Sequence, residues 1–303
     1  MPVSLFHKLL VAPLPYVPKP IVWRFSKRYV AGVDLHSAFD VVRELNALGC
    51  SATIDVLGED STTRSEVDTA RDLYFEALDG IETQQLDCNA SVKLSDIGLR
   101  FDEQLCHDVL DSIVDAAAKH GNFVRIDMED SSVTSITLDI YRRLRERRDN
   151  VGAVIQSCMR RSPNDVRGLL EDGIAHVRLC KGIYVEPDDI AWTDAGDIRR
   201  AYRELLEQLF EGGAEKVGIA THDPELVEHA EAAIRRLDVD RSRYEFQMLL
   251  GVAGTMRTRL VAEGHPLRVY VPFGERWHAY SMRRLRENPG IAMHIVTNLF
   301  SKT

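Results

Sequence analysis

The sequence predicts a single (β/α)8 barrel of the TIM type, with additional N-terminal helices and a C-terminal helix. From residue 49 onward, eight short apolar segments rich in β-branched residues alternate with amphipathic helical stretches, as in parallel strands joined by helices. The length of 303 residues also suits one barrel, which needs roughly 250. No GxGxxG motif follows any of these segments, which disfavours a dinucleotide-binding sheet. A doubly wound open sheet remains the alternative, because a sequence does not reveal strand order.

The eight apolar segments are each short enough to be one buried strand. They are Ser51–Leu57, Ala90–Leu94, Phe123–Met128, Val151–Ser157, His176–Cys180, Lys216–Thr221, Tyr244–Leu249 and Leu267–Val271. Helical spacing of apolar residues is clear in three of the connections. The three stripes are Val67, Ala70, Tyr74, Ala77, Leu78 and Ile81; Leu105, Val109, Ile113 and Ala117; and Leu226, Ala230, Ala233 and Ile234.

The chain divides into an N-terminal helical arm (1–48), the barrel (49–290) and a C-terminal helical tail (291–303). Residues 1–33 carry five Lys and Arg residues and no acid, since Asp34 is the first acidic residue. The favoured interpretation is an arm packed on the barrel. The alternative is a surface that contacts anionic membrane.

Composition narrows the class of protein. The net charge of −9 is unsuited to general nucleic-acid binding. The five cysteines are odd in number and include no CxxC pair, so neither a disulfide framework nor a zinc knuckle fits. We find no apolar run long enough to span a bilayer and no signal-peptide pattern. We therefore expect a cytoplasmic protein, with peripheral contact on the inner face of the membrane left open.

Polar residues gather where the predicted strands end, which is where barrel enzymes place their catalytic groups. They are Glu59, Lys93, Asp127, Glu129, Gln156, Arg178, Lys181, Thr221, His222, Gln247 and Tyr270, and the eighth helix adds Tyr280, Arg283, Arg284 and Glu287. Any one of them alone is more often structural than functional. Together they make a basic mouth that suits a carboxylate or a phosphate.

The residues alone leave several chemistries open. Asp127, Glu129 and Asp130 could hold a magnesium ion, but the neighbouring cations disfavour this, so no metal is expected. A Schiff-base aldolase would use Lys93 or Lys181, and a non-catalytic anion-binding barrel is a further alternative. From these residues alone, we predict a barrel enzyme that acts on an anionic small molecule.

Six ordered motifs take the prediction further. They are Ser91–Ser95 (SVKLS), Val124–Glu129 (VRIDME), Arg178–Tyr184 (RLCKGIY), Ala220–His222 (ATH), Glu245–Leu249 (EFQML) and Arg283–Asn288 (RRLREN). In this order they resemble the motifs of the proline dehydrogenase family, of the monofunctional bacterial type, over about residues 50–290. Cys180 and Ile183 depart from the family's Val-Lys-Gly-Ala-Tyr, and His278 replaces a frequent tyrosine. We interpret Cys180 as a small buried residue, not a nucleophile, and expect the bulk of Ile183 to shift the flavin or its loop slightly.

The resemblance implies a non-covalent FAD and a proline site. The residues expected to contact FAD are Met128, Gln156, Arg178, Lys181, Gly182, Ile183, Thr221 and His222. Arg178 would stabilise negative charge on the reduced flavin, and Asp127 would orient the cationic cluster. Lys93, Arg283 and Arg284 would hold the substrate carboxylate, and Tyr270, Tyr280 and Leu249 would enclose the ring. The product would be Δ1-pyrroline-5-carboxylate.

The resemblance also implies partners and a gate. Electrons would pass to a membrane quinone, and a separate pyrroline-5-carboxylate dehydrogenase would complete the degradation of proline to glutamate. An ion pair between Glu59 and Arg283 would close the eighth helix over the substrate. The alternative is that Glu59 only caps the helix that follows it.

Overall fold

The computed structural model describes residues 19–287, without the side chains of Ile21, Phe25 and residues 283–287. Residues 1–18 of the predicted arm and the predicted tail at 291–303 lie outside this range, so the proposed domain boundaries stay predictions. In the described part, no helix has the length and apolar character needed to cross a membrane.

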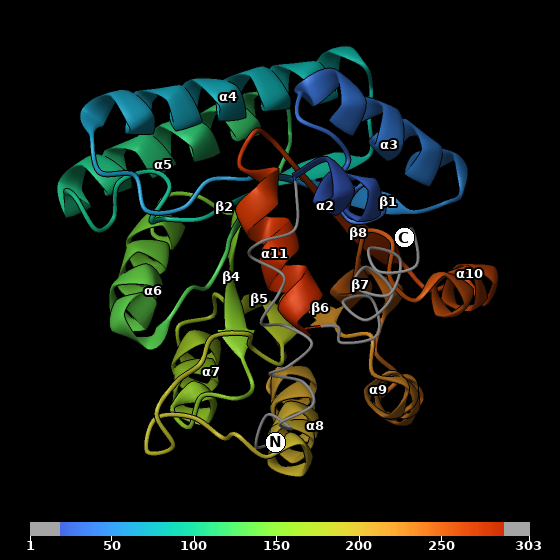
Figure 1. Cartoon of the computed structure of the whole chain (residues 1–303). Helices are drawn as coiled ribbons and strands as arrows, with labels where there is room; N and C mark the ends of the chain where they lie inside the picture. The colour runs from blue at the N-terminus through green and yellow to red at the C-terminus, as the bar shows by residue number, and fades with distance from the viewer. Residues whose placement is uncertain (1–18, 288–303) are drawn as a thin grey trace.

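Eight parallel strands close into a barrel in sequence order, and β8 pairs back onto β1, which confirms the predicted fold (Figure 1). The strands are β1 Ser51–Val56, β2 Cys88–Val92, β3 Val124–Ile126, β4 Val151–Gln156, β5 His176–Cys180, β6 Lys216–Ala220, β7 Tyr244–Leu249 and β8 Leu267–Phe273. Each pairs with the next in parallel register. The C-terminal ends of all eight strands therefore meet at one mouth.

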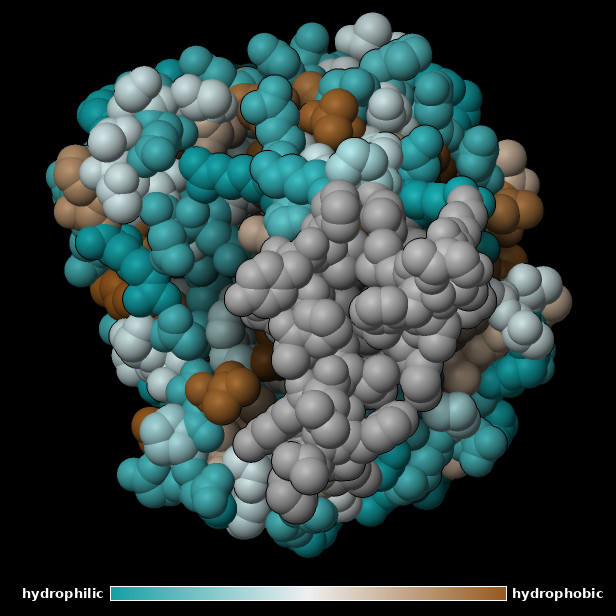
Figure 2. All heavy atoms as spheres, viewed as in Figure 1, coloured by the Kyte–Doolittle hydropathy of each residue, from teal (hydrophilic) through white to brown (hydrophobic). Residues whose placement is uncertain are grey.

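Helices surround the barrel, and Figure 1 shows α11 (red) crossing in front of it. They are α2 Lys19–Ser26, α3 Leu35–Ala47, α4 Arg64–Thr83, α5 Glu103–Lys119, α6 Ser131–Arg145, α7 Ser162–Glu171, α8 Ala195–Glu211, α9 Pro224–Arg236, α10 Gly254–Ala262 and α11 Trp277–Glu287, with a 3-10 turn at Arg241–Arg243. The predicted apolar stripes of α4 and α9 are buried in full, and that of α5 is buried except for the partly buried Leu105. On the face drawn in Figure 2, most of the described surface is hydrophilic.

Capping residues fix where the helices begin. Asp102, Asp130, Asp194 and Asp223 each accept a hydrogen bond from a backbone N–H of the first turn of the helix they precede. The helix α4 starts with a capping box, in which Thr63 and Glu66 satisfy each other's backbone N–H groups. Thr63, and not Glu59, therefore caps the helix after β1, so the capping interpretation of Glu59 is wrong.

The helices α2 and α11 pack together beside the mouth. The rings of Trp23 on α2 and Trp277 on α11 have centroids 4.6 Å apart. Beneath them Val30, Leu57 and Tyr280 form a small buried cluster. This contact ties the last described helix to the segment before the barrel, while α3 packs against β1 and β8.

The interior of the barrel is polar. Side chains alternate along a strand, so in β1 the apolar Ala52 and Ile54 face the helices, whereas Thr53 and Asp55 face inward. Thr53 donates a hydrogen bond of 2.6 Å to the side chain of Asn89 on β2. The apolar core of the protein therefore lies between the strands and the helices, and the space inside the strands is left for polar contacts.

Candidate active site

Near the N-terminal ends of the strands, the interior of the barrel carries a charged layer, which we call the floor. Glu245 on β7 accepts a hydrogen bond from Arg268 Nε (2.8 Å) and forms an ion pair with Lys216 Nζ (3.0 Å). Burial alone would raise the pKa of Glu245, but Arg268 and Lys216 more than offset this and hold the pKa well below its usual range. Glu245 is therefore a buried carboxylate that stays ionised.

Arg125 on β3 completes the floor, and no carboxylate of the described residues forms an ion pair with it. Its Nη1 donates to the backbone oxygens of Ala153 (2.9 Å) and His176 (2.8 Å). Its Nη2 lies 3.0 Å from His176 Nδ1, which must accept because a guanidinium has only donors. Burial, together with the positive charge of Arg125, lowers the pKa of His176 well below its usual value.

Two glycines make room for these long side chains. A Cβ at Gly152 would lie 2.4 Å from Arg125 Nη1, and a Cβ at Gly218 would lie 2.5 Å from Gln247 Nε2. Glycine inside a strand marks such close approaches. The positions of the Arg125 and Gln247 side chains inside the barrel therefore depend on glycine at positions 152 and 218.

A chain of hydrogen bonds runs from the floor to the mouth. Gln247 Nε2 donates to Glu245 (2.6 Å), which leaves Gln247 Oε1 to accept from Arg178 Nε (2.6 Å). Arg178 Nη1 then donates to Asp127 Oδ1 at 2.6 Å. The ionised Glu245 therefore fixes the orientation of the Gln247 amide, and this amide fixes Arg178.

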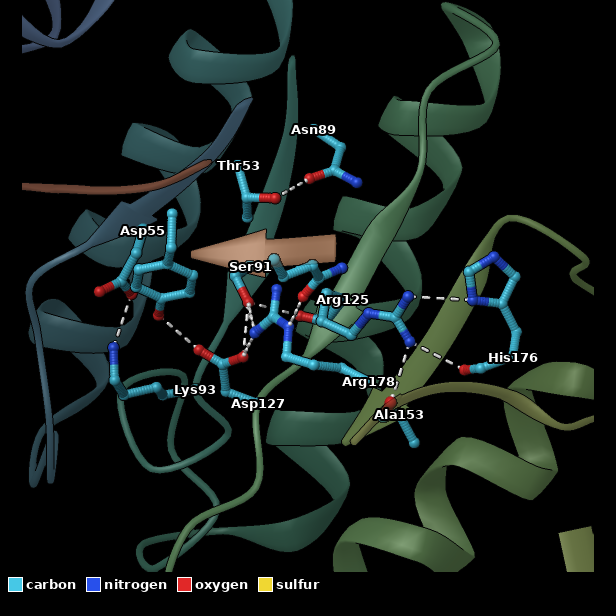
Figure 3. A network of polar contacts seen from close by, with 12 residues as sticks. Thr53, Asp55, Asn89, Ser91, Lys93, Arg125, Asp127, Ala153, His176 and Arg178 are labelled. Atoms are coloured by element: carbon cyan, nitrogen blue, oxygen red, sulfur yellow. Dashed lines mark hydrogen bonds and ion pairs between the residues drawn. The ribbon is translucent and has the colours of Figure 1, made fainter. Parts of the chain in front are cut away.

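Asp127 accepts three hydrogen bonds, and both of its oxygens take part (Figure 3). Its Oδ1 accepts from Ser91 Oγ and Arg178, and its Oδ2 accepts from the Tyr270 hydroxyl, each at 2.6 Å. Burial alone would raise the pKa of Asp127, but Arg178 and then Lys93 lower it below its ordinary value. Asp127 is therefore an anchor for the cationic and phenolic groups around it.

Lys93 has its own carboxylate. Its Nζ donates to Asp55 Oδ1 at 2.6 Å, and both side chains are buried. Burial alone would lower the pKa of Lys93, but Asp55 and Asp127 raise it above its usual value. Burial raises the pKa of Asp55, and Lys93 opposes this. Each buried cation of the mouth, Lys93 and Arg178, is thus paired with one buried aspartate.

These groups line a pocket of about 610 Å³ at the C-terminal ends of the strands, within the size range of small-molecule sites. The structure brings most of the predicted site residues to this pocket. They are Lys93, Asp127, Met128, Gln156, Arg178, Lys181, Gly182, Ile183, Thr221, His222, Leu249, Tyr270 and Tyr280. Their assigned roles stay predictions, since position alone does not test them.

Three predicted residues are not brought to the pocket by the described atoms. Glu59 does not line it, and its backbone oxygen accepts a hydrogen bond from Arg276 Nη1 at 2.9 Å. The side chains of Arg283 and Arg284 lie outside the described part. The gate therefore stays a prediction.

The carboxylates of the magnesium alternative are bound to separate partners. Glu129 accepts from the backbone N–H of Ser95 (2.9 Å) and from its hydroxyl. Asp130 caps α6 and pairs with Arg100. Asp127 is engaged as described above, so these contacts favour structural and anchoring roles for all three.

A second charged group lies at the rim of the pocket. Asp223 accepts from Lys181 Nζ and, at 2.7 Å, from Arg199 Nε, and all three line the pocket. The side chains of Lys181 and Arg199 are about one third exposed, at 36% and 35%. They can therefore meet an anion that enters from solvent.

Sequence reasoning missed several lining residues, namely Asp55, Cys180, Tyr184, Arg199, Asp223 and Met248, and it placed Gln247 at the mouth without giving it a role. The period-two alternation of β1 contained the signal for Asp55, because it shares the inward face with Thr53. No sequence signal joins Arg199 on α8 to Asp223 after β6. Cys180 lines the pocket, but burial raises the pKa of its thiol to about 12, so it is a poor nucleophile.

A closed barrel with a polar interior, whose mouth holds a pocket lined by buried lysine and arginine that are each paired with an aspartate, is the arrangement of a barrel enzyme with a small-molecule site. The family model described as "Proline dehydrogenase" matches residues 38–295. The chain belongs to this family, and it is an oxidoreductase that acts on CH–NH donors.

Known relatives agree with this assignment. Proline dehydrogenase 1 of Bacillus subtilis (strain 168) is 34% identical over 278 residues, which cover 91% of each chain. Proline dehydrogenase of Deinococcus radiodurans is 31% identical over 283 residues, covering 92% of this chain and 91% of that one. Proline utilization A of Bdellovibrio bacteriovorus has the same fold, with a TM-score of 0.84 at 23% identity. That match covers 94% of this chain, which spans only 37% of the longer protein.

Proposed function

We propose that this protein oxidises L-proline to Δ1-pyrroline-5-carboxylate with a non-covalently bound FAD, as the first step of proline degradation to glutamate. The observation that carries the proposal is the mouth itself, where Lys93 and Arg178 are buried, charged and held by Asp55 and Asp127. A small substrate with a carboxylate gains two or more charge-assisted hydrogen bonds there. Membership of the proline dehydrogenase family supplies the reaction class.

The residues of the pocket fit a flavin nucleotide. Apolar Met128, Leu249 and Ile183 offer packing surface for a planar ring, while Lys181 and Arg199 offer charge for a phosphate group. When bound, FAD supplies a two-electron acceptor for hydride.

Gly182 supports the same assignment. Its φ is +96°, and an added Cβ would lie 2.3 Å from Cys158 Sγ. This residue therefore lets the backbone turn tightly along the pocket wall. Beside it, Gln156 is oriented by donating to the backbone oxygen of Glu129 at 2.9 Å. We assign Thr221 and His222, which also line the pocket, to the same cofactor.

The protein's own residues would bind, orient and shield the substrate. Lys93, held by Asp55, would donate to the carboxylate of proline with the Nζ protons that Asp55 does not use. Tyr270 lies across this space, with its ring 5.2 Å from the Arg178 guanidinium, and would exclude water beside the ring of the substrate. Arg178 would place fixed positive charge where negative charge develops during hydride loss to the cofactor.

The arrangement of the lysines disfavours an aldolase. A Schiff-base lysine needs a neutral amine, and therefore a lowered pKa. The pKa of Lys93 is raised instead, because its two aspartate neighbours outweigh its burial. Lys181 is tied to Asp223. An anion-binding barrel without activity has no specific observation in its favour.

The deciding experiment uses the purified protein. It should be yellow, release FAD to the filtrate after denaturation, and lose its flavin absorbance under anaerobic conditions when L-proline is added. A colourless protein that takes up no added FAD would contradict the proposal. Borohydride trapping of a carbonyl substrate would favour the aldolase.

We also assign binding of the substrate carboxylate to Arg283 and Arg284, and this assignment rests on the family resemblance alone. Losing one bidentate contact costs about 2–4 kcal/mol, mostly in kcat/KM. Arg284→Met should therefore lose about two or more decades in kcat/KM and keep its FAD. Unchanged kinetics with proline would reject the assignment.

We retain the gate between Glu59 and Arg283 as part of the proposal. Two contacts of Arg276 support a defined position for the loop of Glu59, one to the Glu59 backbone oxygen (2.9 Å) and one to Glu66 (3.8 Å). Glu59→Ala should raise KM for proline and slow flavin reduction, with FAD content unchanged. Equal reduction rates at every proline concentration in stopped flow would rule the gate out.

Electron transfer to a membrane quinone is the expected next step, and the basic stretch 1–33 is the candidate contact with anionic lipid. Within its described part, Arg28 donates to the backbone oxygen of Gly251 at 2.8 Å, which favours packing on the barrel for this end of the stretch. Sedimentation with anionic and neutral vesicles at two salt concentrations tests the contact. Binding that needs anionic lipid and weakens with salt supports it.

A further inference from the structure

Among the described residues, one carboxylate oxygen of the mouth has no hydrogen-bond donor. Asp55 is 1% exposed and lines the pocket, and its Oδ1 is bound by Lys93 at 2.6 Å. Its Oδ2 is buried and accepts no hydrogen bond from the described residues. The Tyr270 hydroxyl lies close to Asp55, but donates its single proton to Asp127 Oδ2 at 2.6 Å. A buried unsatisfied acceptor costs free energy, so a donor has to come from a ligand or a water molecule.

Both oxygens of the other aspartate of the mouth already have hydrogen-bond donors. Asp127 already accepts from Ser91, Arg178 and Tyr270, with bonds on both of its oxygens. Its pKa is also lowered, because Arg178 and Lys93 outweigh its burial, whereas burial raises the pKa of Asp55. Of these two carboxylates, Asp55 is therefore the better proton acceptor and the one with an open position.

At neutral pH, proline carries an ammonium and a carboxylate on the same carbon. Its two charges therefore lie within about 3 Å of each other, at ion-pair distance. Its complement must also present a cation and an anion side by side. Lys93 and Asp55 do so, since Nζ and Oδ1 are 2.6 Å apart. The lysine then faces the carboxylate of the substrate and the open aspartate oxygen faces the ammonium.

We propose that Asp55 is the acceptor for the substrate ammonium: its Oδ2 binds one N–H and takes that proton before hydride leaves the adjacent ring carbon. This rests on the proposed proline site. In the step, one N–H bond breaks, one O–H bond forms on Oδ2, and the electron pair stays on nitrogen. No atom is oxidised in it. The neutral amine can then stabilise the cation that forms at the neighbouring carbon when hydride is lost.

Several groups set the proton affinity of Asp55. Lys93 from the end of β2 is adjacent, Asp127 from the end of β3 adds negative charge, and Tyr270 from β8 is close. Burial raises the pKa of Asp55, Asp127 adds to this, and Lys93 and the Tyr270 hydroxyl lower it. Protonation of Oδ2 leaves the Oδ1 contact with Lys93 in place. The substrate carboxylate then compensates the charge of the lysine.

The test compares two ligands on the holoenzyme. Cyclopentanecarboxylate has the ring and carboxylate of proline but no nitrogen. Binding of L-proline and of cyclopentanecarboxylate is measured by titration calorimetry on enzyme whose flavin has been reduced beforehand, so that proline is not consumed. Asp55→Asn keeps an oxygen for Lys93 and replaces Oδ2 with an amide. Asp72→Asn, on the exposed face of α4 with a side chain 60% exposed, is the matched control.

In the parent, proline should bind at least tenfold more tightly than cyclopentanecarboxylate. Asp55→Asn should weaken proline tenfold or more, and should bind cyclopentanecarboxylate as tightly as the parent or more tightly. Its flavin reduction by proline should be slow at neutral pH, and the deficit should shrink as rising pH supplies neutral amine from solution. Asp72→Asn should match the parent in all of these.

Three results overturn the assignment. If both ligands weaken in parallel, Asp55 only orients Lys93. If neither changes, a water molecule satisfies Oδ2. Equal affinities of the parent for the two ligands also contradict an ammonium acceptor, and this measurement decides the question if the variant does not fold. A parent that proline does not reduce contradicts the proposed function instead, so the two failures are distinguishable.

Discussion

Glu245→Gln should destabilise the protein strongly, although Glu245 is not among the described residues that line the pocket. The carboxylate is 9% exposed and compensates two cations, Arg268 and Lys216. Removing one partner of a buried charge cluster costs about 3–5 kcal/mol. With about 2.1 cal/mol/K of unfolding entropy per residue, 1 kcal/mol shifts Tm by roughly 1.6 °C in a chain of 303 residues. The expected fall in Tm is therefore about 5–8 °C.

The assay is a thermal melt followed by circular dichroism, with Glu103→Gln as the control. Glu103 is 53% exposed and pairs with Arg143 at 3.1 Å on the surface, where an ion pair contributes about 0–1 kcal/mol. The control should therefore melt within about 2 °C of the parent. If Glu245→Gln melts with the control, the floor does not hold the barrel together as argued.

The same residue predicts a pH dependence. Because the folded pKa of Glu245 lies below its ordinary value, its stabilising contribution is present above about pH 4 and is lost as pH falls below that. The parent should lose Tm steeply on acidification. Glu245→Gln should lose less over the same interval, because the glutamine has no proton to gain.

Two further predictions concern the mouth. Tyr270→Phe removes the 2.6 Å hydrogen bond to Asp127, and a hydrogen bond to a charged acceptor is worth about 1.5–3 kcal/mol. The kcat/KM for proline should therefore fall about 10- to 100-fold, with FAD content unchanged. An unaltered kcat/KM would show that catalysis does not use this bond. Gly182→Ala places a side chain at φ +96° and 2.3 Å from Cys158 Sγ, so flavin retention on a desalting column should fall. The control is Gly254→Ala, whose added Cβ has nothing within 4 Å and which should retain flavin like the parent. Equal retention would place the flavin elsewhere.

The strands and the helix stripes could be predicted because burial imposes periodicity on the sequence. The errors lie at strand ends. β3 is only Val124–Ile126, although the backbone N–H of Asp127 still donates to the carbonyl of Val92 on β2 at 2.9 Å. β8 continues through Pro272 to Phe273, because these two residues stay in parallel register with Asp55 and Val56 on β1.

The site was only partly predictable for a different reason. Polar residues at strand ends are visible in a sequence, and they do surround the pocket. The relay Glu245–Gln247–Arg178 is not visible, because it joins strands that are far apart in the chain, 69 residues in the case of Gln247 and Arg178. Asp55 looks like a strand residue, and the parallel pairing of β1 with β2, which sets Asp55 opposite Ser91, places it beside Lys93.

The ring contact between Trp23 and Trp277 gives the protein a built-in optical reporter. The chain has only three tryptophans, and the third, Trp192, lies apart under the guanidinium of Arg160 at 3.6 Å. Trp192→Phe would therefore leave the pair between α2 and α11 as the sole indole emitters. Because α11 also carries the pocket residue Tyr280, any displacement of this helix during turnover would alter the emission and the near-ultraviolet dichroism of the pair. Opening and closing of the mouth could then be timed without attaching a dye.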